Sequence, residues 1–314
     1  LPILKVSAII PTYRRPALLR ETIDSIWSQT RLPDEILIGD DSPDDETERM
    51  VRDELVPASP VPIRYFHNHP PLREERNVDA LYREAAGSHI LHLHDDDPIL
   101  PRCVELLATA LERHPEAKAA FGRQYILRED GFRLERDSER TNTAYFRTPD
   151  RAGLVDGFFA GAVSMFPNNG FLIEAESARR VGYDSHGAAG SAVDYFFGLR
   201  FGRLRYPMVF VNEYTATVRM TPGSESRVAT ADNSVQRMTH LLASLAPEDI
   251  TPDIRRSIRH HLPFAIANAA DIGRLDTAWK WFVSPYFRHR IFTPTGFKCV
   301  YHMLRRTWLP RTSP

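Results

Sequence analysis

Three adjacent carboxylates, Asp95, Asp96 and Asp97, are the residues with the clearest potential for chemistry. Like charges at this spacing repel one another, so the cluster is most stable where a cation compensates it. A hard divalent ion such as Mg²⁺ or Mn²⁺ prefers oxygen ligands and usually shares them with a phosphate. The residues alone also allow a second interpretation, a solvated acidic turn before a helix over residues 102–113.

The segment before this triplet indicates where it lies. Residues 88–93 are mostly apolar and Pro98 stops strand pairing, so the pattern predicts a short buried strand that ends at the acids. Two earlier apolar segments also run into polar residues, the first into Thr12 and the second into Asp40. The carboxyl ends of parallel strands share one sheet edge, so these loops are expected to converge on one ligand.

The elements that position these loops alternate between strand and helix. The predicted strands are 5–10, 35–39, 63–66, 88–93 and 119–122, and the predicted helices are 18–29, one starting at 44–47, 75–86 and 102–113. Such alternation favours an α/β fold built of parallel βαβ units with right-handed crossovers. The chain has no Gly-x-Gly-x-x-Gly and no Gly-x-x-x-x-Gly-Lys-Ser/Thr motif, which weakens a dinucleotide oxidoreductase or a P-loop NTPase.

The composition excludes further classes. With 40 Lys and Arg against 41 Asp and Glu, the net charge of -1 gives no sign of a nucleic-acid binder. Cys103 and Cys299 lie far apart, so neither a disulfide framework nor a zinc site is indicated. The pattern shows no signal peptide and no apolar run of roughly 18 residues, so we expect a cytoplasmic protein. The arginine-rich composition hints at a bacterial source.

Four motifs in the first hundred residues occur in a recognisable order. They are Ser7 to Arg15, Ile36 to Ser42, Arg76-Asn77 with Ala85-Ala86-Gly87, and Leu93 to Asp97 with Leu100-Pro101. In these motifs the chain resembles the inverting nucleotide-sugar glycosyltransferases of the GT-A fold, family-two type. The resemblance implies a mostly parallel, Rossmann-like central sheet flanked by helices. It divides the chain into a donor-binding half (1–100), an acceptor-binding half (101–230) and a helical, basic C-terminal extension (231–314).

The resemblance also implies how the donor is held. Pro11, Thr12, Tyr13 and Asp40 would bind the base, with Tyr13 stacked on it and Asp40 accepting from the N3–H of a pyrimidine. The expected donor is therefore a UDP- or dTDP-sugar. The alternatives from residue type are a Tyr13 that caps the sheet and an Asp40-Asp41 turn that caps the next helix.

Two arginines complete the donor-binding residues that the resemblance implies. Arg15 belongs to the first motif, and Arg76 would approach the diphosphate, where a guanidinium can make paired hydrogen bonds. For Arg76 the alternative is a solvated helix face, because glutamates are interleaved with the arginines around it.

Within the acidic triplet, the resemblance assigns Mn²⁺ or Mg²⁺ to Asp96, with Asp97 as a second ligand or a supporting residue. Asp95 would reach the ribose or the sugar. His94 stands where relatives often carry an acid, so the division of work among the three carboxylates stays open. His92 and His94 share one face of the strand, which leaves a histidine metal pair as a minor alternative.

The second half supplies the expected acceptor side. Asp194 precedes an apolar helix over 195–201 and matches the family's catalytic base, with Asp184 as its main competitor. Asn169, Asp184 and Arg219 fall where the family binds the acceptor or the diphosphate. Residues 219–226 resemble the loop that closes over the diphosphate, and Met220 replaces a histidine that many relatives carry there.

The other segments of this half have weaker patterns. Residues 128–151 show no period and are expected to form a hairpin or a mobile flap. Two aromatic, glycine-rich stretches, 157–161 and 166–171, are expected to form either a wall close to the sugar or a buried loop.

The C-terminal segment has a helical pattern from about Asn233. After Asp276 it carries basic and aromatic residues but no acid. This description fits an interfacial membrane segment, a dimer interface or a packed cap. The protein would then be peripheral at the inner face of the cytoplasmic membrane, or fully cytoplasmic.

The predicted activity is metal-dependent transfer of a sugar to an acceptor hydroxyl by single displacement, with Asp194 as the base. The acceptor would be a saccharide, a lipid-linked molecule or a small metabolite. The alternatives are a nucleotidyltransferase and a non-catalytic carbohydrate- or nucleotide-binding protein on the same fold.

Overall fold

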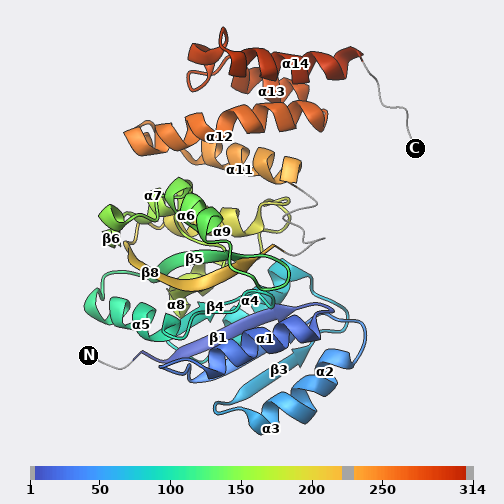
Figure 1. Ribbon diagram of the computed structural model, residues 1–314, viewed down its shortest axis with the longest axis vertical. Helices are drawn as coiled ribbons and strands as arrows, with labels where there is room; N and C mark the ends of the chain where they lie inside the picture. The colour runs from blue at the N-terminus through green and yellow to red at the C-terminus, as the bar shows by residue number, and fades with distance from the viewer. Residues whose placement is uncertain (1–3, 221–229, 309–314) are drawn as a thin grey trace. The chain divides into compact units, whose positions relative to one another are not determined.

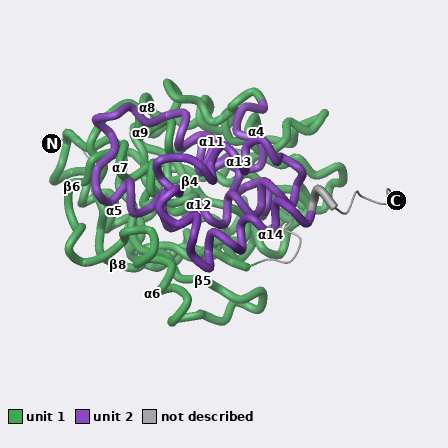
Figure 2. Tube along the Cα trace, turned by 90° about the horizontal axis from the view of Figure 1, so that it is seen from above, with its two compact units in different colours: residues 1–186, 197–222 green, residues 187–196, 223–314 purple. Residues whose placement is uncertain are grey.

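The structure is a computed structural model that describes residues 4–220 and 230–308 (Figure 1). The chain divides into two compact units, Leu1–His186 with Phe197–Pro222, and Gly187–Phe196 with Gly223–Pro314 (Figure 2). Helix α9 (Val193–Gly202) contributes residues to both units.

The described residues of the first unit build an eight-stranded sheet in the order β3-β2-β1-β4-β7-β5-β8-β6. The strands are β1 (Val6–Thr12), β2 (Glu35–Asp40), β3 (Ile63–His67), β4 (His89–His92), β5 (Ala119–Leu127), β6 (Gly153–Val155), β7 (Phe171–Glu174) and β8 (Met208–Arg219). The helices of this unit, besides α9, are α1 (Pro16–Trp27), α2 (Glu46–Met50), α3 (Val56–Ala58), α4 (Glu74–Glu84), α5 (Cys103–Arg113), α6 (Glu135–Ala144), α7 (Gly157–Ala162) and α8 (Ala175–Val181).

The first half of the sheet is parallel, as the alternation predicts. β1 pairs in parallel with β2 and with β4, and β2 pairs in parallel with β3. β1 and β2 are buried along almost their whole length and are mostly apolar, as expected for strands covered on both faces. On one face, Ala8 and Ile10 pack with Ile23 of α1 and Leu107 of α5 in a single buried cluster.

The opposite face carries an aromatic cluster. The ring of His92 on β4 is stacked on Phe171 of β7, with centroids 4.9 Å apart, and on Tyr183, at 5.3 Å. Tyr82 of α4 donates its hydroxyl proton to, or accepts one from, His92 Nδ1 at 3.0 Å. His92 is therefore a core histidine, and this packing does not support the histidine metal pair.

The second half of the sheet is mixed. β7 is antiparallel to both β4 and β5, β5 is parallel to β8, and β6 is antiparallel to β8. The predicted α/β class with a mostly parallel central sheet is confirmed.

The expectation of a hairpin or mobile flap over 128–151 is wrong in part, because α6 occupies the middle of this segment. Its contacts with β5 are polar. Asn142 accepts from the backbone N–H of Gln124 at 3.2 Å and donates to its carbonyl at 2.9 Å. Ser138 accepts from the backbone N–H of Ile126 at 2.8 Å. A helix that binds a strand edge through polar side chains leaves no apolar period in the sequence.

The glycine-rich segment 157–161 is also helical and not a loop. Asp156 caps α7 by accepting from the backbone N–H of Phe159 at 2.7 Å. A Cβ on Gly161 would lie 2.4 Å from the carbonyl oxygen of Gly198 on α9, so the glycine permits the close approach of the two backbones.

The second unit is helical. Beyond residues of α9, it contains α11 (Thr230–Ser244), α12 (Pro252–Asp271), α13 (Leu275–Phe282) and α14 (Pro294–Trp308). α12 packs against the other three helices, with Ile258, Leu262 and Ile266 fully buried. The predicted helical C-terminal extension is confirmed. Among the described residues, no helix combines the length and the hydropathy needed to cross a bilayer.

Candidate active site

The carboxyl ends of β1, β2 and β4 bring the predicted donor residues to one sheet edge. Thr12 and Asp40 are register partners at the ends of β1 and β2, next to Pro11 and Gly39. The triplet lies in the loop after β4, separated from the strand by Leu93 and His94. Thr12 donates its hydroxyl proton to Asp95 Oδ2 at 2.8 Å, and Thr22 of α1 donates to the Asp95 carbonyl at 2.9 Å. The loops after β1 and β4 therefore form one polar surface.

Arg15 joins this surface at the start of α1. Its Nη1 lies 3.3 Å from Asp95 Oδ1 and 3.2 Å from Asp96 Oδ2. Asp95 and Asp96 are both buried, with 6% and 7% of their surface exposed. A guanidinium between two buried carboxylates compensates part of their charge, and it lies where a cation or a diphosphate would meet them.

Asp97 is held by donors from distant parts of the chain. Asn169 donates to its Oδ2, the backbone N–H of Arg219 donates to its Oδ1 at 2.6 Å, and His94 Nδ1 lies 3.3 Å from Oδ2. Asn169 is fully buried. Asn169 and Arg219, which the resemblance places on the acceptor or diphosphate side, thus fix the orientation of the Asp97 carboxylate.

Burial raises the pKa of two carboxyls, Asp95 and Asp97. Burial, followed by the charge of Asp96, raises the pKa of Asp95 to about 6, against the smaller opposing effects of Arg15 and Thr12. Burial also raises the pKa of Asp97, although the hydrogen bond from His94 opposes the shift. Both carboxyls thus ionise more readily when a further positive charge arrives.

The donor set fits a hard divalent ion. Among the described residues of the first unit, His94, Asp96 and Asp97 each offer one ligand atom, and these atoms lie within 4.8 Å of one another. Two carboxylate oxygens are suitable ligands for Mg²⁺ or Mn²⁺. The residue that departs from the family pattern, His94, therefore belongs to the same group as the acids.

Asp40 is oriented by its neighbours at the end of β2. Its Oδ2 accepts from the Tyr65 hydroxyl at 2.6 Å and its Oδ1 from the backbone N–H of Ser42 at 2.8 Å. Burial, followed by the bond to Asp40, raises the pKa of Tyr65, so the phenol stays protonated as the donor. Nearby, Tyr13 exposes 52% of its surface, which leaves its ring accessible for stacking.

Asp41 has a structural role beside Asp40. It accepts from Asn68 Nδ2 at 2.9 Å and from the backbone N–H of Leu72 at 3.0 Å. It therefore ties the loop after β3 to the loop after β2, and it does not act as a helix cap in these contacts.

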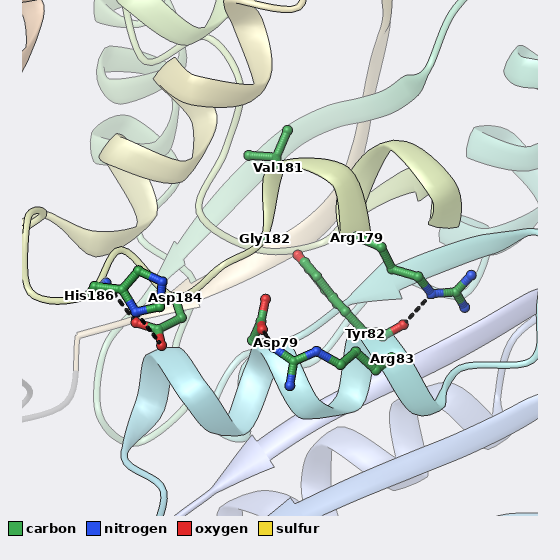
Figure 3. Close-up of a pocket in the computed structure, with 8 residues that line it drawn as sticks. All are labelled: Asp79, Tyr82, Arg83, Arg179, Val181, Gly182, Asp184 and His186. Carbon is green, nitrogen blue, oxygen red and sulfur yellow. Dashed lines mark hydrogen bonds and ion pairs between the residues drawn. The ribbon is translucent and has the colours of Figure 1, made fainter.

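Arg76 and Asp184 form an ion pair. Arg76 Nε lies 3.5 Å from Asp184 Oδ2, and His186 Nδ1 lies 3.2 Å from the same oxygen. Asp184 borders a pocket of about 220 Å³ between α4 and the end of α8 (Figure 3). The lining residues are Asp79, Tyr82, Arg83, Arg179, Val181, Gly182, Asp184 and His186. None of the triplet lines this pocket.

The candidate bases differ in their surroundings. A hydrogen bond from the backbone of His186, followed by the charges of His186 and Arg76, lowers the pKa of Asp184. A carboxylate with a lowered pKa is a weaker proton acceptor. Asp194 lies in the first turn of α9 and is assigned to the second unit. Arg219 ends β8 and Met220 is partly exposed, while the rest of the loop predicted to close over the diphosphate lies outside the described residues.

Sequence reasoning missed a buried polar chain behind Asp97. Arg147, 3% exposed, donates from Nη1 to Gln124 Oε1 at 2.7 Å. Gln124 Nε2 donates to Asn169 Oδ1 at 3.2 Å, and Asn169 donates to Asp97. The one sequence feature that could have indicated this chain of polar residues is Gln124, a buried amide in the mostly apolar strand β5.

Comparisons with known proteins identify the family of the chain. A family model described as "Glycosyl transferase family 2" matches residues 7–172, which is more than half of the 314-residue chain. The chain is 31% identical over 148 residues to GalNAc(5)-diNAcBac-PP-undecaprenol beta-1,3-glucosyltransferase of Campylobacter jejuni, a match that covers 43% of this chain and 45% of the relative. The chain thus spans about half the length of that relative.

Solved structures share the fold. Residues 1–349 of S. aureus TarS in complex with UDP-GlcNAc superpose with a TM-score of 0.65 at 13% identity, over 98% of this chain and 93% of the other. The mannosyltransferase PcManGT from Pyrobaculum calidifontis in complex with GDP-Man and Mn²⁺ gives a TM-score of 0.61 at 16% identity, over 99% and 89%. At these identities the likeness concerns the fold.

Proposed function

The chain belongs to glycosyl transferase family 2, and on this premise we propose that it transfers a sugar from a UDP- or dTDP-sugar to an acceptor hydroxyl with inversion at the anomeric carbon. The observation that carries the proposal is the shared edge of β1, β2 and β4, where Thr12 contacts Asp95 and lies in register with Asp40. The resemblance to this family is confirmed, whereas the donor, the metal and the stereochemistry are the proposed part.

In this proposal the base of the donor stacks on Tyr13. The N3–H of a pyrimidine donates to Asp40, whose orientation is fixed by Tyr65 and Ser42. Guanine also has a ring N–H, at N1, but its second ring places that donor farther from the ribose than the N3–H of uracil or thymine, so Asp40, held in one orientation, would favour the pyrimidines. PcManGT, whose complex contains GDP-Man, shows that the fold itself does not impose a pyrimidine.

Asp96 and Asp97, with His94 beside them, would hold Mn²⁺ or Mg²⁺. A bound divalent ion supplies positive charge to the leaving nucleoside diphosphate. Asp95 would bind the ribose or the sugar. Arg15, within 3.3 Å of Asp95 and Asp96, would turn one or more N–H groups to the phosphates. Arg76, exposed at the start of α4, would approach them from the other side.

Asp194 would accept the proton of the acceptor hydroxyl as that oxygen attacks the anomeric carbon. One displacement requires no covalent intermediate and inverts the configuration. Asp184 is the weaker candidate because of its lowered pKa.

The acceptor proposed first is a lipid-linked saccharide. The name of the Campylobacter relative includes PP-undecaprenol, and the match to this relative covers 43% of the chain. A free saccharide and a small metabolite are the alternative acceptors. The C-terminal extension would serve in homodimerisation or in membrane contact.

The test is a binding and transfer panel. Isothermal titration with UDP, dTDP and GDP, each with and without Mn²⁺, should show tighter binding of the pyrimidine nucleotides and dependence on Mn²⁺. NMR of the product from the preferred sugar donor should show the anomer opposite to that of the donor. Tighter binding of GDP would reject the assignment of Asp40, and a product of retained configuration would reject single displacement. Binding with neither hydrolysis nor transfer would favour the non-catalytic alternative.

A further inference from the structure

Helix α14 exposes an apolar stripe in the second unit. Phe297, Tyr301 and Leu304 expose 62%, 60% and 46% of their surface. They are four and three residues apart, which places them on one face of the helix. Cys299 and Met303 on the opposite face are buried. The helix therefore has two apolar faces, and only one of them is covered by the unit.

The stripe continues before the helix. Phe292 exposes 89% of its surface two residues before α14 begins. Single exposed apolar residues are ordinary on protein surfaces, but a contiguous set of aromatic residues marks an interaction site.

Basic residues border the stripe. Lys298 and Arg305 are exposed, and they are seven residues apart, so both lie on the same side of the stripe along α14. Arg288 is exposed just upstream. No Asp or Glu occurs after Asp276 in the sequence. Asp271 contacts α14 through His302, whose Nδ1 lies 3.1 Å from Asp271 Oδ1. His302 does not share the helix face of Phe297, Tyr301 and Leu304.

We propose that this surface, Phe292, Phe297, Tyr301 and Leu304 with Lys298 and Arg305, docks on an anionic lipid bilayer. Aromatic side chains favour the boundary between headgroups and acyl chains, and lysine and arginine pair with lipid phosphates. The occupant is identified by charge complementarity. A symmetric dimer would bring the same basic patches of two copies together, which like charges oppose.

The docking is peripheral. The chain has no described helix that could cross a bilayer, and α14 would lie in the plane of the interface with its stripe inserted. The inference does not depend on the identity of the sugar or of the acceptor.

Co-sedimentation with vesicles tests the proposal. The chain should bind vesicles of phosphatidylglycerol and phosphatidylcholine much more tightly than vesicles of phosphatidylcholine alone, and less tightly as salt is raised. The double variant K298Q/R305Q should weaken binding to the anionic vesicles by about 25-fold, since each basic residue near the surface contributes about fivefold. The double variant F297S/Y301S should weaken binding to the anionic vesicles more than K298Q/R305Q does. At high salt, where the charges are screened, K298Q/R305Q should bind like the wild type.

Phe132→Ser is the matched control. Phe132 in the first unit is exposed to 61% and lies beside the guanidinium of Arg128, so loss of an exposed aromatic ring alone should leave vesicle binding unchanged. All substituted residues are exposed, and circular dichroism melting should show that the variants stay folded. Absence of vesicle binding, or equal binding to neutral and anionic vesicles, would overturn the proposal. So would a dimer in sedimentation velocity that F297S/Y301S dissociates while the vesicles remain unbound.

Discussion

At the scale of single residues, the three carboxylates after β4 have different surroundings. Asp95 contacts Thr12 and Arg15, Asp96 contacts Arg15, and both oxygens of Asp97 accept from protein donors. Asp96 Oδ2 lies 3.2 Å from Arg15, at the place where a divalent ion or the diphosphate would meet the triplet. Asp97 accepts hydrogen bonds from Asn169 and from the backbone of Arg219. We therefore expect Asp96 to be the main ligand of the ion and Asp97 to contribute less to its binding.

Asp96→Asn should therefore remove metal-dependent donor binding. The amide keeps the size of the side chain but loses the negative charge that a divalent ion requires. We expect nucleotide affinity in the presence of Mn²⁺ to fall to the value measured without it, as seen by isothermal titration. Asp53→Asn, an exposed acid in the same unit, is the control and should bind like the wild type. Undiminished Mn²⁺-dependent binding by Asp96→Asn would assign the ion to other residues.

Asp194→Asn should separate binding from chemistry. Loss of a general base typically costs about 10²-fold or more in rate, while the donor site in the first unit keeps its residues. Steady-state transfer assays should show kcat reduced by about this factor, with nucleotide affinity by titration unchanged. Asp184→Asn is the matched comparison. A near-normal rate for Asp194→Asn together with a large loss for Asp184→Asn would move the base to Asp184.

At the scale of elements, the sequence predicts β1, β2, β4 and their helices well, because a strand buried on both faces is a continuous apolar run. The apolar pattern of the sequence does not predict α6 and α7. α6 binds β5 through Ser138 and Asn142, and polar contacts leave no hydrophobic period. α7 contains glycines that disfavour a helix locally, but close packing against α9 requires them.

The candidate site shows the same limit. Residues at or soon after the carboxyl ends of strands, such as Thr12, Asp40 and Asp95, can be placed at one edge from the pattern alone. Asn169 and Arg219 reach Asp97 across 72 and 122 positions of the sequence. Arg147 and Gln124, which stand behind them, carry no motif. Such long-range polar contacts depend on how β5, β7 and β8 pair, and that pairing is not encoded in any local spacing.

Asn142→Ala tests whether α6 is a structural part of the sheet edge. The substitution leaves the N–H and carbonyl of Gln124 without their side-chain partner. Unsatisfied buried backbone groups cost about 1–3 kcal/mol. Urea denaturation should show a free energy of unfolding lower by about this amount. Arg140→Ala, an exposed position on the same helix, should change it by less than about 0.5 kcal/mol. Equal small effects would mean that α6 is held by other contacts.

At the scale of the whole molecule, charge links the stability of the fold to the ligand that it binds. The net charge of -1 is nearly balanced, yet three carboxylates are concentrated at one buried edge. Burying acids in this way opposes folding unless a cation is present. The buried acids lower the free energy of unfolding of the ligand-free protein, and the same charges increase its affinity for a positively charged ligand.

The pH dependence of stability follows from Asp95. Its pKa rises from the ordinary 3.8 to about 6 on folding, so between these values the folded state retains a proton that the unfolded state has released. The contribution of Asp95 to the free energy of unfolding is therefore greatest below pH 3.8, falls as the pH rises to about 6, and does not change further above that pH. The loss is on the order of 3 kcal/mol, because each unit of pKa difference is about 1.4 kcal/mol. The raised pKa of Asp97 acts in the same direction.

Urea denaturation of the wild type and of Asp95→Asn, without divalent ions at pH 4 to 8, measures this effect. Because the amide does not titrate, the stability of the wild type relative to the variant should fall between pH 4 and 6 and stay level above it. Under the proposal Mn²⁺ would bind the ionised carboxylates, so it should stabilise the wild type increasingly from pH 5 to 7 and very little at pH 4. If the difference between the two proteins were independent of pH, Asp95 would have an ordinary pKa in the fold. If Mn²⁺ stabilised the protein equally at pH 4 and 7, it would bind away from the triplet, and the donor site would need another source of positive charge, for which Arg15 is the nearest.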